Sequence, residues 1–539
     1  MSFDPDPMPF LPALYYWLLV AGGLTINVLV VSLLSMMVIH RGAGGRLFVQ
    51  ELQGCFSDLF SLSPRRIWAL AKLTFMEAYR RRALLIFVVF GLLFMFAGWF
   101  MGGDPAEIKK DQVKIYISFV LRAINWLTLP LMFVLSSFGI PEDIRLRSLH
   151  TVVTKPARRL EIVLGRVIGF SLIGSVVLLV MSVVGWLWIV RQVPESAKSM
   201  LICRVPIHGV LTFLDRNGEP AVAGINTGDI NEFRSYIEGA TKARAIWTFS
   251  GINEQSLDSE GNLHLENQFM AFRSYKGIMD RSLLFDYQFV NKEKNLTFTT
   301  QAWPVDEFRG VTKPIPRKLQ VPGEGKSYDL IKDFVTSKGE LTVEVSCIDR
   351  EQYLGMSRID LFIRLPDHSF ASGFFKAILG IELIMILVVL LGVSASTFLK
   401  GPIATVLTFI LFILSGEDTH KFMDQLVLGR SSKDGFQGGG FFESIYRIVT
   451  HMNPTTDLPD SLAFKFMWLV DSGLTFFLWM CKQVIPQLKY FNMHEYVANG
   501  FDVPWEQSLF PCLLITVGYM LPCVLLGYFA LRIRELESK

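Results

Sequence analysis

Several signatures of soluble enzymes and nucleic-acid-binding proteins are scarce in this sequence. The formal net charge is only +3 over 539 residues, and lysine and arginine gather beside apolar runs instead of forming a basic stripe. This distribution argues against a nucleic-acid partner. No cysteine and histidine set has the spacing of a metal site, and His494-Glu495 lacks the second histidine of H-E-x-x-H. We therefore expect no metal and no catalytic residue.

A nucleotide-binding P-loop is also missing. The stretch Gly325-Lys326-Ser327 ends like a P-loop, but position 320 is glutamine, where the motif needs a glycine that lets backbone N–H groups close on phosphate. The glycine-rich GFQGGG at 435–440 follows no clear strand and predicts a flexible turn. The sequence therefore predicts a non-enzyme that binds no cofactor directly.

Cysteine is rare, with six residues in the whole chain. Cys203 and Cys347 lie near the two ends of the segment 191–372, which we place outside the membrane below. An oxidising compartment would allow these two thiols to form a disulfide. Because the sequence does not give their separation, an unbridged pair remains the alternative.

Long apolar runs are what the sequence has in quantity, since 51% of its residues are hydrophobic. A bilayer core of ~30 Å needs about 20 apolar residues of helix. Six runs have that length: Leu11–Ile39, Ala83–Met101, Ile115–Phe138, Ile162–Val190, Phe374–Leu399 and Leu509–Leu531. Pro402–Ser415 is shorter and makes a seventh, marginal candidate. The fold class predicted is a polytopic α-helical membrane protein.

The basic residues predict how these helices are oriented. If seven helices alternate, the basic clusters all fall on one side, which is then cytoplasmic: Arg41, Arg46, Arg65, Arg66, Lys72, Arg80, Arg81, Arg82, Lys155, Arg158, Arg159, Lys400, Arg532, Arg534 and Lys539. The N-terminus is then outside and the C-terminus cytoplasmic. The first run has no basic segment before it and no cleavage pattern after it, so we expect an anchor that is retained.

A dense charged stretch, IPEDIRLRSLHTVVTKPARRLEIVLGR, lies between the runs at 115–138 and 162–190. Pro141 suits the first turn of a helix, Glu142 and Asp143 complement its positive end, and Pro156 ends it near Thr154. We expect a short amphipathic helix against the cytoplasmic membrane face. A solvated loop whose basic residues only fix orientation is the alternative.

Two further segments favour helices at the membrane surface. In 63–83 the residues Trp68, Ala71, Phe75 and Tyr79 recur at helical spacing among basic residues that include Arg65 and Arg80, which is typical of an interfacial helix. The segment 462–485 is apolar enough to enter the membrane, but a full span there would move the C-terminal tail outside. We expect a re-entrant or interfacial hairpin with Asp471 and Gly473 near its bend.

In their order, these segments resemble the ABC-2 type transport permeases, the membrane subunits of ATP-binding-cassette exporters. The similarity covers 63–190 and 374–537: an interfacial helix before the first core span, a charged loop 140–161 after the second, the short turn Phe398-Leu-Lys-Gly-Pro402, the re-entrant region and the closing Arg532-Ile-Arg-Glu535. The resemblance implies a six-helix core plus one extra N-terminal helix. It implies a dimer, with itself or a related permease, and a separate ATPase that supplies ATP.

The same resemblance implies that the charged loop is a coupling helix on which the ATPase docks. The residues expected in that role are Pro141, Glu142, Asp143, Arg145, Arg147, His150 and Lys155. ATP-driven closure of the ATPase would push this helix and tilt the attached spans. The substrate is left open, since lipid, polysaccharide, peptide or drug export would all fit.

Ionisable residues within apolar runs are the default candidates for a functional site. Arg122 and Glu382 both lie about 11 Å below the outer face by helical rise, so their depths permit an ion pair, and Asn125 could share it. Three alternatives are open. The first is a structural pair or an Arg122 that reaches toward the interface, the second is a polar patch on the substrate route, and the third is no contact at all.

The outer insert 191–372 contains short runs typical of β-strands, including AIWTFSGI, SLLFDYQFV and ELTVEVSCI, separated by turn residues. We expect a β-sandwich that either accepts substrate, docks a partner or forms a rigid cap. The domain division is 1–62, 63–190, 191–372, 373–415, 416–508 and 509–539.

Two other classes of function remain open. A membrane-tethered receptor or envelope scaffold would need no ATPase and would tolerate mutation of the charged loop. A secondary transporter would couple through Arg122, Glu382 or Asp471, but inverted repeats are not apparent in the sequence.

Overall fold

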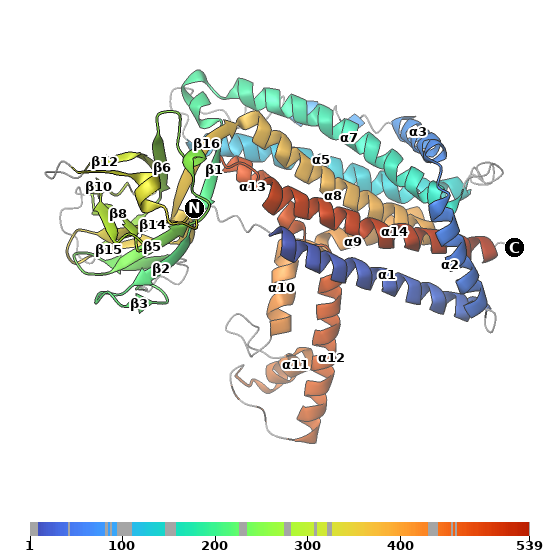
Figure 1. Cartoon of the computed structure of the whole chain (residues 1–539). Helices are drawn as coiled ribbons and strands as arrows, with labels where there is room; N and C mark the ends of the chain where they lie inside the picture. Colours follow the sequence, from blue (N-terminus) through green and yellow to red (C-terminus); the bar gives the residue numbers. More distant parts are fainter. Residues whose placement is uncertain are drawn as a thin grey trace. The chain divides into compact units, whose positions relative to one another are not determined.

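The computed structural model of the chain divides into two compact units (Figure 1). It describes residues 9–537 except 41–43, 81–84, 87–88, 94–109, 146–157, 226–233, 274–281, 307–309, 321–325, 429–439, 454–455, 457 and 459–460. One unit is β-rich and consists of Ser199–Gly373 with Asn499–Asp502, and the other is helical and contains the rest of the described chain. The predicted insert was 191–372, whereas α7 continues to Gln192.

The helical unit contains helices that differ widely in length. They are α1 (Phe10–His40), α2 (Gly44–Phe60), α3 (Pro64–Arg80), α5 (Lys110–Arg145), α7 (Arg159–Gln192), α8 (Phe370–Phe398), α9 (Gly401–Leu414), α10 (Glu417–Leu428), α11 (Phe441–Thr450), α12 (Leu462–Val484), α13 (His494–Ala498) and α14 (Phe510–Glu537). Within it α7 contacts α3, α5 and α14, while α1 lies along α14 (Figure 1).

Among the described residues, six helical segments are long and apolar enough to cross a membrane: Phe10–Ile39, Gln112–Asp143, Arg159–Gln192, Phe370–Phe398, Leu462–Ala498 and Trp505–Ile533. A seventh is possible if α9 and α10, which meet at 66°, count together as one broken span. Many of their apolar side chains are exposed, which in a soluble protein would be unfavourable but in hydrocarbon is not. The architecture therefore fits a polytopic membrane protein. The predicted span at 83–101 lies largely outside the described residues.

The helix directions agree with alternation. Gly518 of α14 lies against Trp17 of α1, and Arg532 at the end of α14 pairs with Glu51 of α2, which follows α1, so α1 and α14 run in the same direction. Near its end α14 also passes Val163 at the start of α7. We call the end of the unit where α7 begins and where α5, α8 and α14 finish the basic end.

The basic end carries the residues that gave the sequence its predicted orientation. Arg66, Arg158, Arg159, Lys400 and Arg532 all belong to helix ends or connections there. The clustering of these cations at one end is a property of the fold, since it follows from the helix directions alone. It is the arrangement expected where one end of a bundle faces the cytoplasm.

The β-rich unit confirms the strands expected from the sequence. They are β1 (Ile202–His208), β2 (Val210–Leu214), β3 (Pro220–Ala221), β4 (Ser235–Glu238), β5 (Arg244–Phe249), β6 (Asn262–Asn267), β7 (Met270–Arg273), β8 (Leu284–Asn291), β9 (Leu296–Thr299), β10 (Trp303–Pro304), β11 (Val311–Pro316), β12 (Lys318–Gln320), β13 (Ser327–Asp329), β14 (Leu341–Cys347), β15 (Gln352–Met356) and β16 (Leu361–Ser369). All the pairings between these strands are antiparallel.

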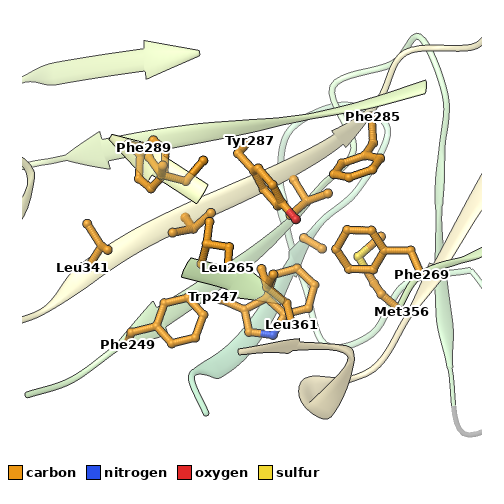
Figure 2. Packing of buried hydrophobic residues seen from close by; sticks show 14 of the residues in the cluster. Trp247, Phe249, Leu265, Phe269, Phe285, Tyr287, Phe289, Leu341, Met356 and Leu361 are labelled. Atoms are coloured by element: carbon orange, nitrogen blue, oxygen red, sulfur yellow. The ribbon is translucent and has the colours of Figure 1, made fainter. Parts of the chain in front are cut away.

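Two main sheets share one core, as expected for a sandwich. One sheet has the order β1-β16-β6-β11, and the larger has β10-β8-β14-β5-β2-β3 with β9 beside β8. Along β8 buried and half-buried residues alternate without a break, so one face contributes Phe285, Tyr287 and Phe289. Figure 2 shows these rings with Trp247 of β5 and with Leu265 and Leu361 of the other sheet. The aromatic core explains why this unit is compact without a disulfide.

Candidate functional site: the helix junction at the basic end

The connecting helix α3 packs on α7 through small residues. Ala71, Thr74 and Ala78 of α3 are buried, while a Cβ placed on Gly165 or Gly169 of α7 would come within 2.5 Å of Leu70 or Thr74. Such close approach of two helices requires glycine at both α7 positions. The α3 helix is thereby fixed along the first turns of α7.

The opposite side of α3 suits a membrane surface. Trp68 is 60% exposed, and Leu73, Met76 and Tyr79 are exposed as well. Arg65, Lys72 and Arg80 are exposed on the same helix, whereas Phe75 is half-buried. Exposed aromatic and basic residues on one short helix are the pattern of an interfacial helix. One side of α3 therefore packs on α7, and the other side is suited to a membrane–water interface.

Glu161 is the centre of the polar contacts at the junction. Its side chain is fully buried and accepts hydrogen bonds from the Ser63 backbone N–H at 2.9 Å and from Arg66 Nη2 at 2.7 Å. The Arg158 backbone N–H donates to the other carboxylate oxygen at 3.0 Å. This carboxylate therefore joins the start of α3 to the start of α7.

Arg166 forms a second connection one turn further along α7. Its guanidinium pairs with Glu77 of α3 at 2.7 Å and with Asp143 of α5. The Asp143 and Arg166 side chains are nearly buried, whereas Glu77 is about one third exposed. Buried ion pairs of this kind lose several kcal/mol, roughly 3–5, when one partner is removed. Three helices are thus held at one guanidinium.

A third connection reaches α2. Arg158 pairs with Asp58 at 2.9 Å and donates to the Ser57 carbonyl oxygen at 3.2 Å. The α2 helix in turn binds the end of α14 through Glu51 and Arg532 at 2.6 Å. The basic end therefore forms one connected set of ion pairs from α5 to α14.

The predicted coupling residues lie at the edge of this set. Pro141, Glu142, Asp143 and Arg145 belong to the last turns of α5, which passes through Pro141 without interruption. The expectation that Pro141 starts a separate helix is therefore wrong: α5 contains Pro141 as it contains Pro130, although each proline leaves one carbonyl without its helical N–H donor. Arg145 is exposed and contacts Glu142 at 3.4 Å. Arg147, His150 and Lys155 lie outside the described residues.

The residues on both sides of the charged loop belong to the described part of the chain. The last described residue before it is Arg145, two residues after Asp143, and the first after it is Arg158. Asp143, Arg158, Glu161 and Arg166 flank the loop and make the contacts described above. The helix ends on either side of the loop are therefore tied to each other and to α3.

The proposed intramembrane pair is not formed. Arg122 is exposed and its Nε lies 3.4 Å from His494 Nε2 of α13, while Glu382 of α8 accepts a hydrogen bond from Ser175 Oγ of α7 at 2.5 Å. Equal depth had made a pair possible, but the two side chains leave their helices toward different neighbours. Asn125 Oδ1 is buried without a hydrogen-bond partner. Glu382 and Ser175 instead form a polar contact between α7 and α8.

The expected hairpin at Asp471 and Gly473 is also wrong. The segment Leu462–Val484 is one continuous helix, α12, and Gly473 lies in its middle with open space around it. Asp471 is buried and accepts from the backbone N–H groups of Phe442 and Glu443 at 2.9 and 3.0 Å. It caps the N-terminus of α11, where a carboxylate is favoured by the helix dipole.

In α11 and α12 several charged groups are buried, while many apolar side chains are exposed. Arg447 of α11 is buried and pairs with Glu443 at 2.8 Å, whereas Phe441, Ile448 and Trp468 are more than 60% exposed. This distribution is the reverse of that in a soluble helical hairpin. It fits a segment whose surroundings are apolar.

The β-rich unit contains a contact set that the sequence did not indicate. Arg204 of β1 pairs with Glu266 of β6, donates to the carbonyl oxygens of Asn499 and Gly500, and lies 4.2 Å from the centre of the Phe501 ring. His368 pairs with Asp502 at 2.9 Å. The segment 499–502 is thereby bound beside β1. The separation of 295 residues left no local signal for it.

Of the two states left open for Cys203 and Cys347, the structure shows the unbridged pair. Cys203 and Cys347 are both buried, and they belong to different sheets, in β1 and β14. Burial raises the pKa of Cys347 to about 12, so its thiol stays protonated and unreactive at neutral pH. Across the described residues no three His, Cys, Asp or Glu side chains are grouped so that they could hold a metal ion.

The comparisons with known proteins assign no family to the chain. No family model, no curated protein and no solved structure matches it. Function must therefore be argued from the junction and its chemistry. Of its residues, the sequence analysis named Asp143 and Arg158, whereas Glu161 and Arg166 entered only within the charged stretch 140–166 and Glu77 not at all. A charged residue within an apolar run was the signal that could have identified Arg166.

Proposed function

We propose that the chain is the permease subunit of an ATP-driven exporter of the ABC-2 type. In this proposal it works as a dimer, and a separate ATPase docks on the loop at 140–161. The observation that carries the proposal is the connected set of ion pairs on both sides of that loop. A load applied to the loop would reach α5, α7 and α3 together.

Mechanical coupling needs stiff connections, and the junction supplies them. Asp143 before the loop and Arg166 after it are in direct contact, so the ends of α5 and α7 move as one piece. The α3 helix is held to the same piece by Glu161 and by the close packing at Gly165 and Gly169. A solvated loop that only fixes orientation would not require nearly buried ion pairs on either side.

ATP would come from the partner, because the sequence contains no complete P-loop. A pathway between two copies would use helix faces that have no partner within one chain. The α7 helix exposes Leu179, Val183 and Leu187 in the described structure. Such a face is suited to lipid or to a second permease, and dimerisation would cover part of it.

The test is affinity purification of the tagged chain in mild detergent. We expect a Walker-motif ATPase in stoichiometric amount with the wild type. It should be lost with the triple variant Glu142→Lys, Arg145→Glu, Arg147→Glu, because that variant reverses the charges of the docking loop. A matched control makes the same charge changes at three exposed residues of the β-rich unit: Glu260→Lys, Lys318→Glu and Lys338→Glu.

A second variant separates docking from coupling. Glu161→Gln removes the charge that holds Arg66 while leaving the docking residues 141–155 unchanged, so we expect the ATPase to co-purify but ATP hydrolysis by the complex to fall severalfold. If no ATPase co-purifies with the wild type under conditions that preserve a known transporter complex, the exporter proposal fails. A receptor or envelope scaffold anchored by the helices would then explain the chain better.

A further inference from the structure

A cavity of about 270 Å³ lies between α1, α14 and the chain that follows α12. Its volume is near the lower limit of the roughly 300–1,000 Å³ typical of ligand pockets. Two of its walls, α1 and α14, belong to segments that are apolar enough to span a membrane. The α1 helix is also the one that the resemblance leaves outside the transporter core.

The lining of the cavity changes character along its length. Tyr490 lies at the first turn of α14, where its carbonyl oxygen accepts from Cys512 Sγ. Gln487 is on the same connecting segment, and Lys482 is in the last turn of α12. Ala21 and Leu24 lie one and two turns beyond Trp17 on α1, and Leu24 is thus about 10 Å further along the helix. One part of the cavity is polar, therefore, and the deeper part is apolar.

Trp17 provides an independent sign that a ligand group is missing. Its indole Nε1 is buried and has no hydrogen-bond partner, and it lines the cavity where α14 has Gly518. A buried indole N–H normally has an acceptor. Water would need two to four polar partners to remain in such a site, and the deeper lining is apolar.

We propose that this cavity binds one acyl chain of a membrane phospholipid. Its head group lies at Gln483 and Gln487, whose amide N–H groups can donate to phosphate oxygens, beside the Lys482 ammonium, which also pairs with Asp424. Its ester carbonyl oxygen lies at Trp17 Nε1 and supplies the missing acceptor, and the acyl chain extends from there toward Ala21 and Leu24. Hydrocarbon is the medium that surrounds α1 and α14 in a membrane, so a lipid can enter from the side without crossing water.

A bound lipid would stabilise the packing of α1 on α14. The acyl chain fills space that would otherwise weaken the packing of α1 on α14, because unfilled apolar cavities are destabilising. The inference depends on insertion of α1 and α14 into a membrane and is independent of any ATPase. Its failure would therefore leave the proposed transporter function untouched.

The first test counts lipids retained by the purified chain in native mass spectrometry. Val20→Trp places an indole in the cavity, and Leu18→Trp is the matched control because Leu18 points away from it and is 58% exposed. We expect one firmly held phospholipid per chain in the wild type and in Leu18→Trp, and at least a threefold lower occupancy in Val20→Trp. Equal occupancy in all three proteins would overturn the proposal.

The second test does not depend on any variant and identifies the source of the ligand. Delipidated wild-type chain in dodecyl maltoside is titrated with dioleoyl phosphatidylglycerol or dioleoyl phosphatidylethanolamine, and its thermal midpoint is recorded. Binding to the folded state raises that midpoint. We expect a rise of several degrees with either phospholipid and none with additional detergent. An unchanged midpoint with both phospholipids, or an equal rise with detergent, would overturn the proposal.

Discussion

Two buried charged residues at the basic end, Glu161 and Arg166, each connect neighbouring helices. Glu161 alone receives two backbone N–H groups and one guanidinium, so it acts as a cap for α7 and as an anchor for α3. Arg166 performs the equivalent task for α3 and α5. Both residues lie at or within an apolar run, where an ionised side chain is retained only with partners.

His208 of β1 leads to a prediction on pH. Its ring nitrogens have no hydrogen-bond partner, and burial together with the nearby Arg358 guanidinium lowers its pKa from 6.5 to about 4. Between pH 6.5 and about 4, His208 therefore binds a proton more readily in the unfolded β-rich unit than in the folded one. Stability is complete above pH 6.5 and falls as pH decreases toward 4, by at most about 3 kcal/mol from this group.

The corresponding experiment compares wild type with His208→Phe, which keeps a ring beside Phe362. Calorimetry of the full chain at pH 7.5 and 4.5 should show the midpoint of the β-unit decreasing by roughly 5–10 °C more in the wild type than in the variant. Other carboxylates titrate equally in both proteins and cancel. An identical decrease in the two proteins would show that His208 does not contribute.

Residue-level expectations failed where direction mattered. Arg122 and Glu382 have similar depths, but depth does not determine the direction in which a side chain leaves its helix. The helix phase sends Arg122 toward His494 and Glu382 toward Ser175. The sequence could therefore predict that both helices contain an ionisable residue at this depth, but not that Arg122 and Glu382 do not pair with each other.

At the level of elements, glycine has two opposite roles in this chain. Gly169 allows α7 to approach α3, whereas Gly473 of α12 faces open space. We predict that Gly473→Ala leaves stability unchanged or raises it by about 1 kcal/mol through helix propensity. Gly169→Ala should lower it by roughly 1–3 kcal/mol because its Cβ would lie 2.5 Å from Thr74.

Thermal unfolding of the two alanine variants against wild type measures this contrast. The comparison is matched, since the same chemical change is made in the middle of two apolar helices. A bend at Gly473 would reverse the first result, because alanine disfavours the backbone conformations that glycine allows in a tight turn. A clear loss of stability in Gly473→Ala would thus contradict a continuous α12.

The hairpin expectation failed for an identifiable reason at this level. It was based on counting membrane crossings, which required 462–485 not to cross, and the acid at Asp471 was then assigned to a bend. In the structure Asp471 caps α11, so its polarity is used by a neighbouring helix instead. A capping partner 28 or 29 residues away gives no local pattern in sequence.

For the whole molecule, the prediction concerns sidedness. The directions of α1, α7 and α14 place the basic residues at one end of the helical unit, and the chain enters the β-rich unit after the opposite end of α7. We expect Asn217→Cys of the β-rich unit to react with a membrane-impermeant maleimide in intact spheroplasts, and Lys400→Cys to react only after permeabilisation.

Both labels are introduced into a Cys481→Ser background, because Cys481 is the one native cysteine that is not buried. Wild type with only that change serves as the unlabelled control. Labelling of both positions from the same side would exclude the proposed orientation. The outcome also decides whether the basic end can face an ATPase, since ATP is available in the cytoplasm.

The sequence by itself determined the class of the molecule: long apolar runs specify helices suited to a membrane, alternating β-branched and aromatic residues specify the strands of the β-rich unit, and basic flanks specify which helix ends belong together. These properties are local, and hydrophobic periodicity expresses them directly. Tertiary structure alone decided which charges meet, as in Arg166 with Asp143 and Glu77, Asp471 with α11, and Arg204 with the segment 499–502. Pairing depends on helix phase and on contacts between residues far apart in the chain, neither of which leaves a local pattern.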